Sequence, residues 1–285
     1  MSYRKRLDRA FDHAPILPIT PNTKYVFFSD CHRGAGTNND NFLKNASSYF
    51  AALQYYYQYG FCYIEVGDGD ELWENKCFHQ IREIHSDVFA QLCQFHRCGR
   101  LFLLYGNHDM VKKCRPDLCT DLPFYEGVIL TSEAPLITLR VTHGHQADFF
   151  NSVLWRLSRF LVRHLWSPLE YFGMLDPTSA AKNNTKKGKI QKRFISYAED
   201  RECLLLTGHT HKPTLGEEHS LYYNCGSCVH PRCITCIELC GYTISLVKWH
   251  YCTAKSEHFG NIYAQCPPTF PVYVKREVLS SRMLV

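Results

Sequence analysis

Five short apolar runs divide most of the chain, and each has the length of a single β-strand. They are Tyr25–Ser29, Phe61–Val66, Leu101–Tyr105, Leu136–Thr142 and Cys203–Thr207. None of them alternates strictly between apolar and polar residues, which is typical of strands covered on both faces of a sheet. Apolar residues recur at helical spacing in residues 40–59 and 78–96, between the first three runs. This alternation of strands and helices predicts an α/β fold.

Each run is followed at once by side chains that can bind a metal ion. The groups are Asp30 and His32, Asp68 and Asp70, Asn107 to Asp109, His143 and His145, and His209 and His211. Taken singly, each group is a common turn or helix-cap sequence. In open α/β sheets, however, ligands bind in the crevice outside the carboxyl ends of the strands. We therefore expect the five groups to converge on one site.

Carboxylate, amide and imidazole donors in this number suit two neighbouring divalent cations. Imidazole favours Mn, Fe, Zn or Co over Mg and Ca. Two such cations, held about 3.5–4 Å apart, activate water near neutral pH and offset the charge of an in-line displacement at phosphorus. The sequence thus predicts hydrolysis of a phosphate ester or pyrophosphate.

The same groups form the blocks D-x-H, GD, GNH[DE], H and GHxH, in that order, between Asp30 and His211. In this the chain resembles the calcineurin-like metallophosphoesterase superfamily. The resemblance implies a four-layer αββα sandwich, in which two facing β-sheets are flanked by helices. It also implies a single domain over residues 1–285, with a helical cap inserted at 149–200 and a C-terminal extension at 251–285.

The resemblance further implies a role for each site residue. One metal ion would be held by Asp30, His32, Asp68 and His211. The other would be held by Asp68, Asn107, His143 and His209, so that Asp68 bridges the two. A hydroxide between the ions would be the nucleophile, His108 would protonate the leaving oxygen, and Asp109 would hold the His108 ring. Manganese is the expected metal, with Fe, Zn or Co as alternatives.

Residues 149–200 carry the whole positive excess of the chain, with nine basic and four acidic groups against a formal net charge of +5. At about 100° per residue, four leucines share one arc of a helix and three arginines share another. They are Leu154, Leu157, Leu161 and Leu165, and Arg156, Arg159 and Arg163. This predicts a basic amphipathic helix suited to an anionic lipid or phosphate, or else a helix that packs its leucines on the domain and leaves its arginines in water.

The insertion is similar to the helical cap of UDP-2,3-diacylglucosamine pyrophosphatases. That resemblance implies a small anionic substrate, such as a nucleotide- or lipid-linked pyrophosphate or a phosphodiester, and peripheral membrane contact through the cap. Substrate contacts are expected from His145, Asp148, Asp70, Arg156, Arg159 and Arg163. Asp70 could instead cap a helix that begins near Glu71. The chain departs from that branch in having His108 where those enzymes have Arg, and in the acid-rich residues 67–73.

Other members of the superfamily supply the alternatives. These are a protein Ser/Thr phosphatase, a cyclic-nucleotide phosphodiesterase, and a nuclease that contacts nucleic acid through a lysine-rich loop at residues 183–189. From a different class, the chain could be a metal-free interaction scaffold. The complete set of ligand positions argues against a scaffold, so the leading prediction is a metal-dependent phosphohydrolase.

The 15 cysteines form an odd number, and no apolar leader sequence precedes them, which predicts a cytoplasmic protein. The stretch 149–172 is interrupted by arginines and is too polar for a membrane span. Five cysteines between Cys225 and Cys240 have a spacing that could hold zinc or an iron–sulfur cluster. Apolar residues over 233–239 and 242–249 instead predict two strands, which would separate the thiols. A late edge strand is expected at 271–275, with residues 280–285 as a tail.

Overall fold

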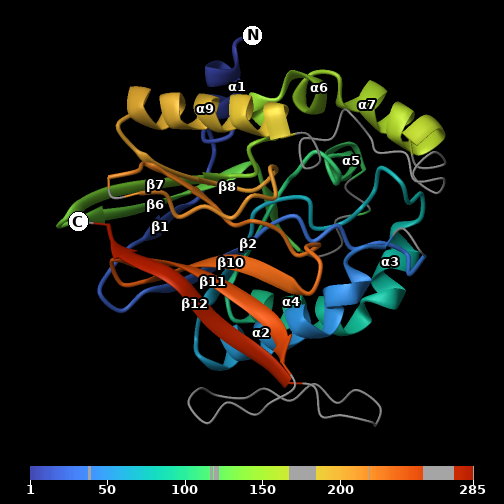
Figure 1. The fold of residues 1–285 in the computed structure, drawn as a ribbon, viewed down its shortest axis with the longest axis horizontal. Coiled ribbons are helices and arrows are strands. Elements are labelled where there is room, and N and C mark those ends of the chain that lie inside the picture. Colours follow the sequence, from blue (N-terminus) through green and yellow to red (C-terminus); the bar gives the residue numbers. More distant parts are fainter. Residues whose placement is uncertain are drawn as a thin grey trace.

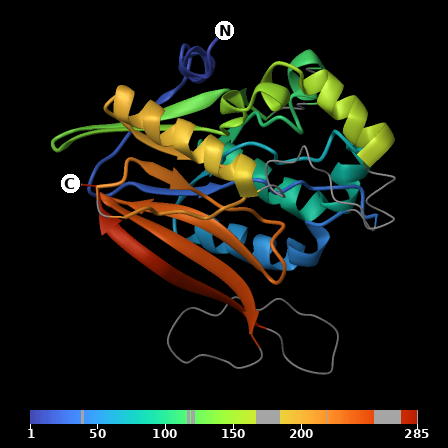
Figure 2. The same cartoon turned by 45° about the horizontal axis from the view of Figure 1, so that its top comes forward.

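The computed structural model describes residues 1–37, 40–115, 118, 122–166, 184–217, 219–252 and 273–284. Within them the chain has the α/β class that the sequence predicts. Two mixed sheets lie one above the other, with helices on their outer faces (Figures 1 and 2).

Seven strands form the larger sheet. They are β2 (Lys24–Phe28), β3 (Cys62–Glu65), β4 (Leu101–Leu104), β5 (Phe124–Tyr125), β10 (Cys233–Cys240), β11 (Thr243–Cys252) and β12 (Tyr273–Met283). Their order across the sheet is β12-β11-β10-β2-β3-β4-β5. The strands from β2 to β5 are parallel, and β10, β11 and β12 join them as an antiparallel group.

Five strands form the smaller sheet. They are β1 (Ile16–Pro18), β6 (Gly127–Glu133), β7 (Leu136–Thr142), β8 (Leu204–Thr207) and β9 (Tyr222–Asn224), in the order β1-β6-β7-β8-β9. β6 and β7 are antiparallel, whereas β7, β8 and β9 are parallel. The five predicted apolar runs correspond to β2, β3, β4, β7 and β8, so that prediction is confirmed.

The predicted helical regions are also helical, with breaks. Residues 40–59 contain the short 3-10 helix η1 (Leu43–Asn45) and then α2 (Ala46–Gln58). Residues 78–96 are divided at His85 into α3 (Phe78–Ile84) and α4 (Ser86–Arg97).

Among the described residues, three large cores hold these elements together, and a smaller one forms around Leu72, Phe78 and Ile81. Phe27 and Ile64 of the larger sheet pack with Leu130 and Leu139 of the smaller one, which joins the two sheets face to face. The other face of the larger sheet packs on α2 and α4. The other face of the smaller sheet packs on α9 (Asn184–Asp200), with Leu7 of α1 (Tyr3–Arg9) in the same core.

The insertion departs from the single amphipathic helix that the sequence predicts. After η3 (His145–Ala147), the insertion begins with α6 (Phe149–Ser152), α7 (Trp155–Leu161) and the π-helix η4 (Val162–Trp166). The predicted leucine arc is not a buried face, because Leu157 is 51% exposed and Leu165 is 46% exposed. Residues 167–183 lie outside the described part of the chain.

The lysine-rich segment 184–189 was predicted as a loop, and that prediction is wrong. These residues form the first turns of α9. The helix continues because Ile190, Phe194, Tyr197 and Ala198 recur at helical spacing and are all buried against the smaller sheet. Among the described residues, no helix combines the length and apolar character needed to cross a membrane.

The late cysteines lie mainly on strands, as the apolar pattern predicts. Cys225 belongs to the core between the sheets, whereas Cys228 and Cys236 belong to the core under α2. No cysteine in the described ranges takes part in a group of side chains close enough to share a metal ion. β12 confirms the late edge strand but extends it, because Ser280 to Met283, predicted as a tail, pair with β11. The rest of the C-terminal extension, 253–272 and residue 285, lies outside the described residues.

Candidate metal centre

The predicted ligands come together where the central strands of the two sheets end. Asp30 and His32 follow β2, Asp68 follows β3, and Asn107 follows β4; His143 follows β7, and His209 and His211 follow β8. Main-chain hydrogen bonds join the loops, from His32 N to Asp68 O at 2.9 Å and from Gly208 N to His143 O at 3.1 Å. Strands from both sheets therefore contribute to one site.

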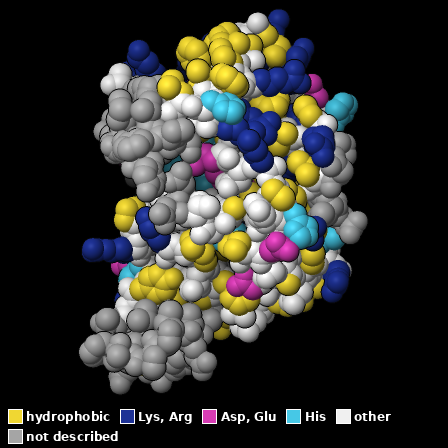
Figure 3. All heavy atoms as spheres, turned by 90° about the vertical axis from the view of Figure 1, so that its right-hand side faces the viewer, with side chains coloured by type: hydrophobic (Ala, Val, Ile, Leu, Met, Phe, Trp, Pro, Cys, Tyr) yellow, Lys and Arg dark blue, Asp and Glu magenta, His cyan; other side chains and the backbone are white. Residues whose placement is uncertain are grey.

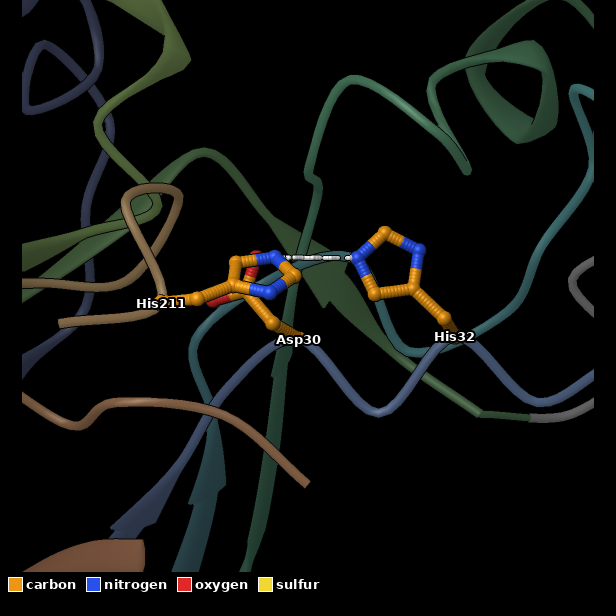
Figure 4. A group of neighbouring side chains, drawn as sticks. All are labelled: Asp30, His32 and His211. Atoms are coloured by element: carbon orange, nitrogen blue, oxygen red, sulfur yellow. Dashed lines mark hydrogen bonds and ion pairs between the residues drawn. The ribbon is translucent and has the colours of Figure 1, made fainter. Parts of the chain in front are cut away.

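The first group of donors is Asp30, His32 and His211 (Figure 4). Asp30 Oδ1 lies 3.0 Å from His211 Nε2 and 3.7 Å from His32 Nε2. The two imidazole Nε2 atoms are 3.3 Å apart. Three donor atoms thus point at one volume that could hold a cation.

The second group is Asp68, His143 and His209. His143 Nε2 lies 3.2 Å from Asp68 Oδ2 and 3.2 Å from Asn107 Oδ1, so Asn107 joins this group. Asp68 Oδ2 is also 3.8 Å from His32 Nε2 in the first group. That oxygen lies between the two groups, where a bridging carboxylate would have to be.

Hydrogen bonds from the surrounding chain leave one donor atom of Asp30, Asp68 and His143 turned toward the centre. Asp30 accepts from Ser29 Oγ at 2.6 Å and from His209 N at 2.9 Å, both through Oδ2, which leaves Oδ1 for the centre. Asp68 accepts from His108 N at 2.8 Å through Oδ1, which leaves Oδ2. His143 Nδ1 donates to Val66 O at 2.8 Å, so its Nε2 keeps the lone pair. Such outer contacts fix the orientation of metal ligands.

Two buried polar atoms of the described site lack a hydrogen-bond partner, and each could contact a metal ion instead. Within the described part of the chain, Asp30 Oδ1 and His209 Nε2 make no hydrogen bond, although both are buried. Buried polar atoms nearly always have a partner. A cation on each side of Asp68 Oδ2 would supply one, so the donor set is compatible with two divalent metal ions.

The backbone of these ligands is strained. Asp30, His32, Asp68, His209 and His211 have φ values of 54°, 49°, 51°, 65° and 54°. Among the described residues only three other non-glycine residues have a positive φ. The left-handed region is unfavourable for residues with a side chain, and such strain persists mostly at functional sites.

Two glycines make room for the carboxylates. A Cβ on Gly106 would lie 2.0 Å from Asp68 Oδ1, and one on Gly208 would lie 2.5 Å from Asp30 Oδ2. The glycines of the GNH and GHxH blocks are therefore required by close approach to the ligands.

The partner of His108 is Glu71, and the prediction that Asp109 holds this ring is wrong. His108 Nδ1 lies 2.8 Å from Glu71 Oε1 and 2.7 Å from Oε2. His32 Nδ1 lies 2.8 Å from Glu71 Oε2, so one carboxylate contacts both rings. Trp73 stacks on the His108 ring at 4.2 Å and 20°.

Asp109 is turned away from His108 because its carboxylate is used by the main chain. It accepts from Gly106 N at 2.7 Å and from Gly69 N at 3.2 Å, and Lys112 Nζ lies 3.8 Å from it. Burial raises the pKa of Asp109 to about 6. Asp109 therefore shapes the loop that carries Asn107 and His108.

Asp70 is neither a site carboxylate nor a helix cap, because two buried basic side chains bind its carboxylate. Arg33 Nε donates to it at 2.7 Å, and Lys112 Nζ contacts its other oxygen. Burial alone would raise the pKa of Asp70, but Arg33 and Lys112 outweigh burial and hold that pKa at about 2. Residues 72–74 form a turn in place of the expected helix.

His145 and Asp148 lie at the edge of the second group. The His145 ring is buried, 5.6 Å from the His143 ring, and its Nδ1 makes no hydrogen bond within the described residues. Burial lowers the pKa of His145, and the nearby His143 adds to this effect. Asp148 Oδ2 lies 3.7 Å from His209 Nε2 and 2.7 Å from Lys186 Nζ. Asp148 thus contacts the second group through His209, and within the described part of the chain neither residue belongs to a group of three donors.

The three cap arginines have different surroundings. Arg156 lies at the surface over the Trp155 ring, at 5.4 Å. Arg159 is partly buried, and burial together with Arg163 lowers its pKa. Arg163 donates to the carbonyl oxygens of Leu72 and Trp73. Of the three, Arg163 alone has hydrogen bonds in the described chain to the turn beside His108.

Glu71 and Trp73 are the site residues that sequence reasoning missed. Glu71 follows Asp68 by three residues in the acid-rich stretch 67–73. That stretch was the available signal, but nothing local indicates which of its carboxylates faces His108.

Comparisons with known proteins do not assign the chain. No protein-family model matches it, and no curated protein matches it. Among solved structures, a cold-active protein-tyrosine phosphatase of the psychrophile Shewanella sp. is 14% identical, over 81% of this chain and 79% of that one, with a TM-score of 0.39. A point mutant of a cold-active protein tyrosine phosphatase is 13% identical over the same shares, with a TM-score of 0.41. Likeness at this level does not identify a shared fold or activity.

Proposed function

We propose that the chain is a dinuclear-metal-dependent phosphohydrolase of the calcineurin-like type, with the four-layer αββα arrangement of that superfamily. One observation carries this proposal: Asp68 Oδ2, a member of the second donor group at 3.2 Å from His143 Nε2, also lies 3.8 Å from His32 Nε2 in the first group. The strained backbone of five ligands and the two buried atoms without hydrogen bonds support it.

The residues divide between two cations. Asp30, His32, Asp68 and His211 would hold one, and Asp68, Asn107, His143 and His209 would hold the other. The proposed metal is Mn, with which a mixed set of imidazole and carboxylate donors is compatible, and Fe, Zn or Co are the alternatives. When bound, such a pair supplies an activated water and offsets negative charge at phosphorus.

His108 is the residue that would protonate the leaving oxygen. Its Nδ1 faces the Glu71 carboxylate, so Nε2 is the atom from which a proton can reach the substrate. As the P–O bond breaks, the electron pair stays on the leaving oxygen and the His108 proton neutralises it. Trp73 and Glu71 hold the ring so that this nitrogen faces the centre.

The proposed substrate is a small anion with a phosphomonoester, phosphodiester or pyrophosphate bond. A nucleotide- or lipid-linked pyrophosphate is the leading class, because the positively charged insertion lies beside the centre. Lys186 of α9 lies against Asp148, which is near His209. Figure 3 shows Lys and Arg side chains together with hydrophobic ones over the upper part of the face that carries the cap.

Elemental analysis and a substrate panel test the proposal. The chain is loaded with Mn²⁺ and assayed on p-nitrophenyl phosphate, bis-p-nitrophenyl phosphate, a UDP-linked pyrophosphate and a cyclic nucleotide. About two metal ions per chain with turnover of one of these substrates are expected. His108→Ala should keep both metals and lose turnover, whereas Asp68→Asn should lose both. If the chain binds no metal after incubation with Mn²⁺ and hydrolyses none of the four substrates, the proposal is contradicted.

A further inference from the structure

Arg163 connects the cap insertion to a turn beside the centre. It belongs to the π-helix η4, and its Nε donates to Trp73 O at 2.8 Å. One of its terminal nitrogens donates to Leu72 O at 2.9 Å and to Asn75 O at 3.3 Å. A π-helical turn is rare and occurs most often at functional positions. One side chain of the cap thus holds three carbonyl groups of a single turn.

The same turn carries the two residues that hold His108. Trp73 stacks on the His108 ring, and its indole Nε1 donates to Asn107 O at 2.6 Å. Trp73 N also donates to Glu71 Oε1 at 3.1 Å, which orients the carboxylate.

The turn is tied together internally. Asn75 donates to Glu71 O from its backbone nitrogen at 3.3 Å and from its side chain at 2.9 Å. Glu71, Trp73 and Asn75 are therefore linked by hydrogen bonds within one turn. The Arg163 guanidinium contacts backbone carbonyl groups of this turn, and the Glu71 carboxylate contacts the His108 and His32 rings.

We propose that Arg163 is a positioning residue, which holds the 71–75 turn and thereby fixes Glu71 and Trp73 against His108 and His32. The inference rests on the proposed function, because it assigns His108 and His32 the roles given there. It replaces the expectation that Arg163 contacts the substrate. The position of the cap then determines how well the acid and one metal ligand are ordered.

The different shapes of the arginine and lysine side chains allow a positioning role of Arg163 to be distinguished from an effect of its charge alone. A planar guanidinium can donate to several carbonyl groups in fixed directions, whereas a lysine ammonium is a compact point charge. If Arg163 acted by attracting an anionic substrate, Arg163→Lys would keep most of the activity. If Arg163 positions the turn, Arg163→Lys should be nearly as impaired as Arg163→Met.

The kinetic test uses the Mn-loaded full chain with p-nitrophenyl phosphate. Both Arg163 variants should lower kcat about tenfold or more, a part of what a general acid contributes, with little change in KM. Lys192→Gln removes an exposed positive charge from α9 and should leave kcat unchanged. Wild-type kcat in Arg163→Lys, or a change confined to KM, would overturn the inference.

A second test needs no turnover. The indole N–H signal of Trp73, identified by its loss in Trp73→Phe, is followed by hydrogen exchange in the metal-free chain. Exchange should be about tenfold faster or more in Arg163→Met and unchanged in Lys192→Gln, because the turn opens more often. Unchanged exchange in Arg163→Met would overturn the positioning role even in an active enzyme. Faster exchange in a chain that hydrolyses no phosphate ester would overturn only the proposed function.

Discussion

The Arg33 guanidinium donates two hydrogen bonds to the Glu65 carboxylate, at 2.7 and 2.8 Å, and both side chains are 1% exposed. This ion pair lies beneath the loop that carries Asp68, because Arg33 also donates to Asp70. A buried pair of this kind is costly to break from one side, since the remaining charge stays in the interior.

Arg33→Met should therefore lower the free energy of unfolding by roughly 3–5 kcal/mol. Urea denaturation measures this. The surface pair of Lys248 and Glu277, 2.6 Å apart, provides the control, and Glu277→Gln should cost less than about 1 kcal/mol. Similar losses in the two variants would show that the Arg33 pair contributes no more than a surface pair.

Asp70 should make the stability depend on acid pH. Its pKa is about 2 in the folded chain, against 3.8 for an unperturbed aspartate. The lowered folded pKa means that its contribution, on the order of 2 kcal/mol, is present above the unfolded pKa and lost as the pH falls through the folded pKa. Unfolding free energies of the wild type and Asp70→Asn should differ at pH 6 and converge toward pH 2. Parallel curves over this range would contradict the assignment.

Glu71 and Asp109 should respond differently to the loss of their charge. Glu71→Gln should lower kcat about 100-fold, because its amide cannot accept from both rings and His108 loses its orientation. Asp109→Asn should mainly lower the free energy of unfolding, because its carboxylate accepts from two backbone nitrogens. Steady-state kinetics and thermal melts of both variants measure this. A larger loss of kcat in Asp109→Asn than in Glu71→Gln would instead indicate that Asp109 holds the His108 ring, as the sequence predicted.

Gly106 and Gly188 form a matched pair of glycine substitutions. Gly106→Ala places a Cβ 2.0 Å from Asp68 Oδ1 and should reduce both metal content and stability. Gly188 lies within α9 and has nothing within 4 Å of the added Cβ. Gly188→Ala should therefore stabilise the chain by about 0.5–1 kcal/mol. Elemental analysis and thermal melts test both, and full metal content in Gly106→Ala would show that Asp68 does not need this space.

Metal binding should stabilise the folded chain. Mn²⁺ at about 100 times its dissociation constant should add about 2.7 kcal/mol per site to the free energy of unfolding, and a chelator should remove this gain. Asp30→Asn should show a smaller gain, because the buried Oδ1 would lose its charge. A melting temperature that is the same with Mn²⁺ and with chelator would contradict two metal sites.

The strands and the polar side chains at their carboxyl ends were predictable because each depends on a few consecutive residues. An apolar run followed by Asp-x-His or Gly-Asn-His indicates both the strand and the side chain at its carboxyl end. The convergence of these ends follows from the parallel arrangement of β2, β3 and β4.

Contacts between distant segments could not be predicted in this way. Glu71, Asp70 and Asp109 are all carboxylates near His108 in the sequence, and local spacing does not rank them. Asp70 forms ion pairs with Arg33 and Lys112, and Asp109 accepts hydrogen bonds from two backbone nitrogens. Glu71 is therefore the carboxylate that contacts the His108 ring. The leucine arc failed for a similar reason, because the breaks at Val153 and Leu154 and the π-helix η4 rotate later residues away from ideal helical positions.

The left-handed backbone of five ligands also has a consequence for protein engineering. Each of these residues holds a conformation that glycine adopts freely and that other L-residues adopt at a cost of about 1–2 kcal/mol. Selection for thermal stability alone would favour glycine at His211, whereas Asp30 also accepts hydrogen bonds from Ser29 and His209 that glycine could not replace. Under the proposed function, glycine at His211 would remove a metal ligand, so stability and activity would oppose one another there, and a stabilising design should leave this residue unchanged.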